Sequence, residues 1–331
     1  MRAALLLAPE KIEIGDIQTP SPAADEVLIE PAYAGICGTD TSFYLGRRIA
    51  PYPFVLGHEA IGRVVALGAA VTKLRFGQRV IVEPNYPCGR CHLCLKGRGA
   101  VCAQKGSMGV NLPGCFSELA LAPAEFVWPL PDSISDQDAA TIEPLTVSLH
   151  GLLQSGVRKG DVVAVLGCGV VGLLLIHAAA AMGIRAIAHD RFADKLEMAR
   201  SLGAEMVSGL DGAAEAWNAA GVQTVFECAG AAATVELALQ AAPRGSQVIL
   251  LGLSSSPVSF MPMRLVREGI NVQTSMIYDH PKDFARSIDL VARDVLHPAR
   301  IVTHTYSFES IREALALSGT GKAGKIHIKM A

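Results

Sequence analysis

The sequence of 331 residues lacks a strong excess of charge of either sign. Its 29 basic and 31 acidic side chains leave a formal net charge of −2, and the isoelectric point is about 6.5. A chain without a broad cationic field attracts neither the phosphates of nucleic acid nor an anionic lipid surface. The composition therefore argues against nucleic acid and membrane as main partners.

A long apolar leader is also lacking. The first apolar run ends by Ala8, which is too short for the core of a secretory signal. Residues 162–184 carry no formal charge and approach membrane-spanning length, but Gly167, Gly169 and Gly172 interrupt them. We interpret this segment as a strand, a turn and a buried helix. We expect a cytoplasmic protein, in which cysteines stay reduced.

The length and the patterning of the chain predict two domains. Residues 1–147 contain short apolar runs separated by Gly and Pro, as in antiparallel β structure. Residues 148–278 alternate strand-like runs with helix-length stretches, which is typical of a parallel, doubly wound sheet. Residues 279–331 have the texture of the first part again, so we expect a return to the first domain. The predicted fold class is α/β.

Four of the eight cysteines lie in the stretch PCGRCHLCLKGRGAVC at residues 87–102. In a reducing compartment this spacing favours a metal site over disulfides. Four thiolates fill the coordination of a tetrahedral zinc and leave no position for water or substrate. A zinc-ribbon binding module is the alternative, and the neutral charge balance disfavours it. The predicted ligands of a structural zinc are Cys88, Cys91, Cys94 and Cys102.

The stretch GCGVVG at residues 167–172 follows a strand-like run and opens a helix. Glycines there let backbone approach a pyrophosphate, while the helix N-terminus supplies amide donors. Asp190 ends the next strand-like run and can accept from ribose hydroxyls. Its carboxylate favours NAD over NADP, although Arg191 and Lys195 are close enough to weaken this preference. The predicted cofactor contacts are Gly167, Gly169, Val170, Val171, Gly172, Asp190, Arg191 and Lys195.

Two further motifs, GICGTD at residues 35–40 and LGHE at residues 56–59, contain other potential metal ligands. Cys37, His58 and Glu59 form a mixed set that can leave one coordination position of zinc free. From the residues alone this is only suggestive. A buried cysteine, a hydrogen-bonded core histidine and a surface glutamate are the alternatives.

The order of these motifs resembles the zinc-dependent medium-chain dehydrogenase/reductase family, which contains the alcohol dehydrogenases. The resemblance covers essentially the whole chain, and the EPL motif at residues 143–145 points to the branch of sorbitol-type polyol and threonine dehydrogenases. It implies a GroES-like β-rich catalytic domain that opens and closes the chain, a Rossmann-type coenzyme domain between, and a homodimer or homotetramer.

The same resemblance implies that Cys37, His58 and Glu59 hold a catalytic zinc, with Glu143 ligating it or steadying its water. Neighbouring residues of a strand point to opposite faces, so His58 and Glu59 can share a metal only if the backbone turns. Otherwise Glu59 lies behind the ion. Asp40 is expected to accept the second ring N–H of His58, or else to cap a turn.

The implied reaction moves a hydride between an alcohol and NAD. Zinc would lower the pKa of the alcohol hydroxyl, and Thr39 could take its proton. The resemblance also implies two groups of contacts whose motifs are less specific. For the cofactor these are Leu251, Leu253, Met276 and Ile277, and for the substrate pocket they are Phe43, Tyr44 and Tyr278.

Two departures from the family pattern bear on the substrate. Ser42 stands where many relatives carry a histidine, and Ile277 stands where sorbitol-type enzymes carry an arginine. Without the histidine, proton release must use a hydroxyl, water or the ribose. The missing arginine, beside Phe43 and Tyr44, favours a less polar pocket and leaves open a secondary alcohol, a modified sugar or carbonyl reduction. One alternative is a threonine 3-dehydrogenase-like enzyme, for whose substrate charges we identify no partners. Another is a nucleotide-binding protein with a vestigial metal site, which would hold one zinc per chain instead of two.

Overall fold

The computed structural model describes residues 1–330, which form two compact units. Unit 1 combines residues 1–143 with the chain from Val302 onward, and unit 2 comprises Pro144–Ile301. Unit 1 is rich in antiparallel strands and unit 2 contains a parallel sheet. The predicted α/β fold class is confirmed.

The bounds of the units differ from the predicted 1–147, 148–278 and 279–331. The return to unit 1 comes at Val302, later than predicted, because the helix Lys282–Ala292 packs with unit 2. Its Phe284 is buried beside Tyr278, with the ring centroids 5.7 Å apart. Farther on, the His297 amide donates to His177 Nε2 (3.0 Å). A helical pattern in the sequence does not reveal which core the helix covers.

Unit 1 contains one large central sheet, antiparallel except for one parallel pair of strands, and two smaller sheets. Its strands are β1 (Arg2–Ala8), β2 (Lys11–Asp16), β3 (Glu26–Ile36), β4 (Phe54–Val55), β5 (Glu59–Leu67), β6 (Arg79–Val82), β7 (Asn85–Tyr86), β8 (Gly106–Ser107), β9 (Ala120–Pro123), β10 (Val127–Pro129), β17 (Val302–Ser307) and β18 (Lys325–Lys329). Its helices are α1 (Gly38–Tyr44), α2 (His92–Leu95), α3 (Asp136–Ala139) and α11 (Ile311–Gly319), with 3-10 turns η1 (Gly99–Val101), η2 (Ala124–Phe126) and η4 (Phe308–Ser310).

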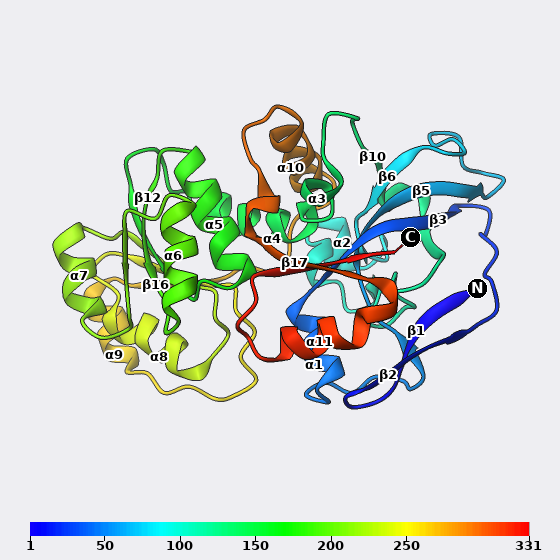
Figure 1. Cartoon of the computed structure of the whole chain (residues 1–331). Coiled ribbons are helices and arrows are strands. Elements are labelled where there is room, and N and C mark those ends of the chain that lie inside the picture. The colour runs from blue at the N-terminus through cyan, green and yellow to red at the C-terminus, as the bar shows by residue number, and fades with distance from the viewer. Residues whose placement is uncertain (331) are drawn as a thin grey trace. The chain divides into compact units, whose positions relative to one another are not determined.

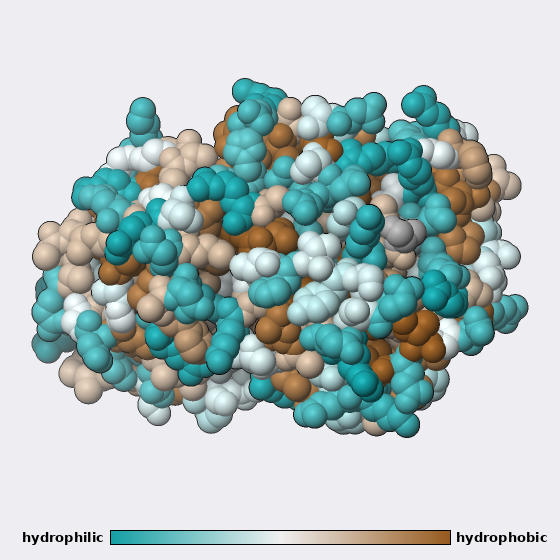
Figure 2. All heavy atoms as spheres, in the orientation of Figure 1, coloured by the Kyte–Doolittle hydropathy of each residue, from teal (hydrophilic) through white to brown (hydrophobic). Residues whose placement is uncertain are grey.

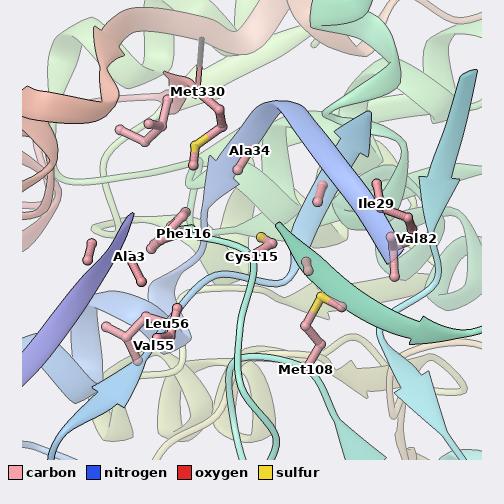
Figure 3. Packing of buried hydrophobic residues seen from close by; sticks show 14 of the residues in the cluster. Ala3, Ile29, Ala34, Val55, Leu56, Val82, Met108, Cys115, Phe116 and Met330 are labelled. Carbon is pink, nitrogen blue, oxygen red and sulfur yellow. The ribbon is translucent and has the colours of Figure 1, made fainter. Parts of the chain in front are cut away.

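Strand β3 is the centre of this sheet. The order is β10-β6-β5-β3-β18-β17, and β9 also pairs with β3. Two smaller sheets, β2-β1-β4 and β7-β8, lie beside it. Because β18 pairs directly with β3, the strands from Val302 onward join a sheet whose other strands come from residues 26–129. The apolar core includes Phe116, Leu56 and Ala3, which lie close together in Figure 3.

Unit 2 contains a six-stranded sheet in which every neighbouring pair is parallel. Its strands, β11 (Val162–Leu166), β12 (Arg185–His189), β13 (Met206–Ser208), β14 (Thr224–Glu227), β15 (Gln247–Leu250) and β16 (Asn271–Thr274), are arranged in the order β13-β12-β11-β14-β15-β16. Its helices are α4 (Ile142–Gln154), whose first two residues belong to unit 1, α5 (Val170–Ala181), α6 (Ala193–Ser201), α7 (Ala213–Ala220), α8 (Ala232–Ala241), α9 (Pro262–Glu268) and α10 (Lys282–Ala292), with η3 (Pro298–Ile301).

This strand order is that of a dinucleotide-binding doubly wound sheet. Helices α5, α6 and α8 pack against the strands (Figure 1). Strand β11 is buried along its whole length, which explains why its sequence is a continuous apolar run. In such sheets, ligands bind at the carboxyl ends of the strands, where the order reverses beside β11.

Residues 162–184, which carry no formal charge, form strand β11 and the helix α5 that packs against the sheet. Most of α5 is buried in unit 2, and no helix within residues 1–330 is both long and apolar enough to cross a membrane. On the face shown in Figure 2, hydrophobic areas are interrupted by hydrophilic residues.

Candidate functional site

Cys37 and His58 come from neighbouring strands of unit 1. Cys37 follows β3 and is the N-cap residue of α1, and His58 immediately precedes β5. The two strands pair antiparallel with Gly35 opposite Glu59. This pairing brings two motifs that are separate in the sequence to the same end of two interior strands.

The backbone turns at Gly57, which has φ +93° in the left-handed region that favours glycine. A Cβ at this position would lie 2.6 Å from the Phe116 ring, and the Cys115 amide donates to the Gly57 carbonyl (3.0 Å). His58 therefore stands outside the side-chain alternation of β5. This turn removes the geometric objection to His58 and Glu59 facing one metal.

The fully buried side chain of Asp40 links the two motifs through their backbones. Its Oδ2 accepts from the Cys37 amide (2.9 Å) and its Oδ1 from the Gly57 amide (3.0 Å). Oδ1 is 3.6 Å from His58 Nδ1, which is too far for a hydrogen bond. The expected ring hydrogen bond is thus not formed, because the carboxylate is directed at backbone amides instead. Its charge still faces the imidazole.

Cys37, His58 and Glu59 bring their ligand atoms within 4.8 Å of one another. His58 and Glu59 are buried, and His58 Nδ1 and Glu59 Oε1 have no hydrogen-bond partner among the described residues. Burial lowers the pKa of His58, but the charges of Asp40 and Cys37 outweigh it and raise this pKa well above its ordinary value. These surroundings stabilise positive charge. One sulfur, one nitrogen and one oxygen donor suit a zinc with an open coordination position.

Lys325 is a residue of this site that the sequence interpretation missed. Its side chain is fully buried, and Nζ contacts Glu59 Oε2 and donates to the Ile36 carbonyl oxygen (2.9 Å). In the stretch KIHIKM the alternation puts Lys325 on the polar side of the strand, where a lysine normally meets solvent. No local signal distinguishes it from a surface charge.

The structure does not bring Glu143 into the three-residue group. Glu143 is buried in the first turn of α4, and Thr39 is half-buried in the first turn of α1. Phe43 and Tyr44 are packed in the core of unit 1, where little of their surface remains for a substrate. The roles assigned to these four residues stay predictions.

The four clustered cysteines form a second group within 4.8 Å, and none is in a disulfide. The Sγ–Sγ distances are 3.9 Å for Cys88–Cys94, 3.5 Å for Cys91–Cys94 and 3.9 Å for Cys91–Cys102. A tetrahedral zinc with Zn–S bonds of about 2.3 Å requires separations of about 3.8 Å. The backbone amides of Arg90 and Cys91 lower the pKa of Cys88 to about 6, whereas desolvation and the neighbouring thiols raise the pKa of Cys94 to about 12. The group fits a closed zinc site.

The glycines of the turn after β11 have three different surroundings. Gly167 has φ +93°, and a Cβ there would lie 2.7 Å from that of Ala229. A Cβ at Gly172 would lie 1.9 Å from the Gly167 carbonyl oxygen, whereas one at Gly169 would meet nothing within 4 Å. Gly167 and Gly172 therefore permit tight packing. Gly169, the N-cap of α5, leaves the open space that a phosphate requires.

Comparison with known families extends these observations. The profile of the alcohol dehydrogenase GroES-like domain matches residues 23–132, and the profile of the zinc-binding dehydrogenase matches residues 170–293. A sorbitol dehydrogenase of Bacillus subtilis is 31% identical over 327 residues, covering 95% of this chain and 92% of the relative. The chain belongs to the zinc-binding dehydrogenase family. The predicted membership of the zinc-type alcohol and polyol dehydrogenases is confirmed.

Two solved structures with a similar fold carry a dinucleotide. A protein described as a short chain alcohol dehydrogenase (rspB) from Escherichia coli, complexed with NADH, has a TM-score of 0.93 at 28% identity and covers 100% of this chain and 99% of its own. A putative zinc-binding dehydrogenase from Sinorhizobium meliloti, bound to NADP, has a TM-score of 0.92 at 30% identity, with 99% coverage of both chains.

In this zinc-binding dehydrogenase, Asp190 closes the glycine turn. Its Oδ2 accepts from the Cys168 amide (2.7 Å) and its Oδ1 from the Phe192 amide (3.0 Å). Each oxygen keeps capacity for another donor such as a ribose hydroxyl. The Arg191 guanidinium and the Lys195 ammonium lie over the Phe192 ring, 4.7 and 5.6 Å from its centroid. Two cations therefore flank the predicted ribose partner.

The other predicted cofactor contacts follow the ends of β15 and β16. Leu253 and Met276 are exposed apolar side chains, and Leu251 is half-buried. Ile277 has φ +44°, a conformation that strains a β-branched residue and is concentrated at functional sites. Tyr278 is buried. These five assignments also stay predictions.

Glu227, at the carboxyl end of β14, is a second residue that the sequence interpretation missed. It is fully buried, and Oε1 accepts from the amides of Ala229 and Gly230 (both 3.0 Å) and from Thr234 Oγ1 (2.7 Å). Ala229 in turn packs against Gly167. Glu227 therefore orders the loop behind the glycine turn. The sequence does contain a signal for this residue, because a carboxylate ends the otherwise apolar run TVFE at residues 224–227.

Proposed function

We propose that this zinc-binding dehydrogenase is an NAD-linked enzyme that interconverts an alcohol and its carbonyl product. The substrate would be a polyol, a sugar-derived alcohol or another secondary alcohol. The observation that carries the proposal is that the ligand atoms of Cys37, His58 and Glu59 lie within 4.8 Å of one another, beside the buried carboxylate of Asp40. The sorbitol dehydrogenase relative supports the alcohol class.

Each residue of the group would have a definite task. Cys37 and His58 would hold a catalytic zinc, Glu59 would add an oxygen ligand, and Glu143 would ligate or steady a water. When bound, zinc supplies a Lewis acid that lowers the pKa of a substrate hydroxyl. The Thr39 hydroxyl would accept the substrate proton while passing its own proton on to a water, another hydroxyl or the cofactor ribose. The four-cysteine group would hold a second, structural zinc.

Asp190 supports a preference for NAD over NADP, because a carboxylate repels a 2′-phosphate. Arg191 and Lys195 reduce this preference by placing cations beside it. Since the two solved neighbours carry NADH and NADP respectively, the family framework accommodates both. We expect NAD to give the larger kcat/KM.

We further propose a homodimer or homotetramer in which the edge strand β16 pairs with its copy. β16 lies at the end of the parallel sheet and all its residues are exposed. An exposed edge strand is a template for pairing. Val272 of this strand is exposed, and so are apolar side chains on helix α9 and just before it, namely Phe260, Met261, Met263 and Val266.

A cytoplasmic location is proposed from the cysteines. All eight are free, and the four-cysteine group requires reduced thiols. The net charge of −2 again provides no reason to expect nucleic acid as a partner.

The decisive experiment measures dinucleotide reduction across polyols, sugar alcohols, simple secondary alcohols and L-threonine, with NAD and NADP in turn. The expected result is NADH formation with a secondary alcohol or polyol and about two zinc ions per chain. Cys37→Ser should remove one zinc and the activity, whereas Cys115→Ser, a core position outside the group, should retain both. One zinc in the wild type, or activity untouched by chelation, would overturn the proposal.

A further inference from the structure

Lys325 contacts both strands that carry the predicted zinc ligands. Its Nζ donates to the carbonyl oxygen of Ile36, the residue before Cys37, and contacts Oε2 of Glu59, the residue after His58. Lys325 lies 266 residues from Glu59 in the chain, and both side chains are buried from solvent. A lysine in such a position is retained only with compensating charge.

The strand between them is shaped for this contact. Gly35 of β3 pairs with Glu59 of β5 on one side and with His327 of β18 on the other. A Cβ at Gly35 would lie 1.9 Å from Glu59 Oε2 and 2.7 Å from Lys325 Cε. The ion pair therefore occupies the space that any larger residue at position 35 would fill.

The two carboxylate oxygens of Glu59 differ in their surroundings. Oε2 is engaged by Lys325, whereas Oε1 is buried and has no hydrogen-bond partner among the described residues. A carboxylate can bind a metal through one oxygen or through both. With Oε2 engaged by an ammonium group, only Oε1 is free for a cation at Cys37 and His58.

We propose that Lys325 is a positioning residue that limits Glu59 to one zinc-ligating oxygen and so keeps a coordination position open for substrate. The inference rests on the proposed catalytic zinc. Removal of the ammonium group would leave a buried carboxylate without its counter-ion, and the nearest cation would be the metal. Glu59 would then bind with both oxygens and close the open position.

The test compares Lys325→Met with Lys325→Arg, and uses Lys329→Met as a control because Lys329 is an exposed lysine of the same strand. Zinc release to excess chelator is followed together with the visible spectrum of the cobalt-substituted protein. We expect K325M to release the catalytic zinc about tenfold or more slowly. This change is opposite in direction to the roughly 10- to 100-fold loss of metal affinity that is usual when a residue behind a metal ligand is replaced. Its cobalt spectrum should show higher coordination. K325R and K329M should behave as the wild type.

A second variant pair separates positioning from general support of the fold. In a Glu59→Gln background, adding K325M should leave zinc release and the cobalt spectrum unchanged, because Lys325 acts through Glu59. If K325M does not fold, Gly35→Ala, which displaces the same ion pair, should reproduce the slower release.

Two results would overturn the inference: faster zinc release in the Lys325 variant, or an effect of equal size without Glu59. A wild type with only the structural zinc would instead refute the proposed catalytic site, and this inference with it.

Discussion

Asp40 is fully buried and accepts backbone hydrogen bonds from both ligand-bearing segments. Replacing it by asparagine puts an amide N–H₂ against one of these N–H donors, so one buried donor loses its acceptor. Asp40→Asn should lower the free energy of unfolding by about 1–3 kcal/mol. It should also reduce the zinc content by up to one ion per chain, as measured by urea unfolding and metal analysis.

Asp132→Asn is the matched control, since Asp132 is exposed in the same unit. It should leave both quantities unchanged. Wild-type stability and zinc content in the Asp40 variant would show that its two hydrogen bonds do not position the ligand segments.

For single residues, the sequence motifs were enough to predict the candidate metal ligands but not all of the hydrogen bonds around them. Cys37, His58 and Glu59 lie in short, recognisable stretches, and the structure brings their ligand atoms together. The bond of Asp40 to the Gly57 amide was not predictable, because it depends on the pairing of β3 with β5. Sequence spacing carries no information about which donor a buried carboxylate meets.

Among the elements, the segment that carries the four cysteines has little apolar support. Helix α2 has no buried residue, and Arg90, Lys96 and Arg98 are exposed. A loop held by a metal loses its order when the metal leaves. Chelation of the structural zinc, or Cys102→Ser, should therefore make the segment sensitive to trypsin at these three sites.

Mass spectrometry of the fragments measures this effect, and Cys228→Ser, in unit 2, serves as the control. Cleavage should begin within residues 90–98 and precede digestion elsewhere. An equally resistant segment after complete loss of zinc would contradict a structural role for the metal.

The order of strands and helices in unit 2 was predictable from the sequence pattern. Runs such as VVAVL are buried on both faces of the parallel sheet, and their continuous apolar character marks them in the sequence. The packing of α10 was not predictable, because its apolar face fits any core of suitable shape. The unit boundary was consequently expected at 279 instead of 302.

For the whole molecule, the exposed edge of unit 2 leads to a prediction about assembly. Val272 lies in the edge strand β16 and Val266 is 81% exposed on α9. A buried charge at a pairing edge is costly, so the double variant Val266→Glu, Val272→Lys should shift the protein from dimers or tetramers to monomers. Light scattering coupled to size-exclusion chromatography measures the mass.

The double variant Phe76→Glu, Ile49→Lys provides the control, since both residues are highly exposed in unit 1. It should retain the wild-type mass. Circular dichroism should show both variants folded. A monomeric wild type, or an unchanged mass after the edge substitutions, would contradict pairing through β16.

The sequence by itself determined what depends on near neighbours in the chain. The four-cysteine spacing, the glycine turn and the β–α alternation are local patterns, so residue type and periodicity suffice to recognise them. Tertiary structure alone decided the contacts of Lys325 and Asp40. A lysine at position 325 reads as a surface charge until β18 pairs with β3 and buries it beside Glu59. Burial and charge pairing arise only when distant segments meet, and no local pattern encodes that meeting.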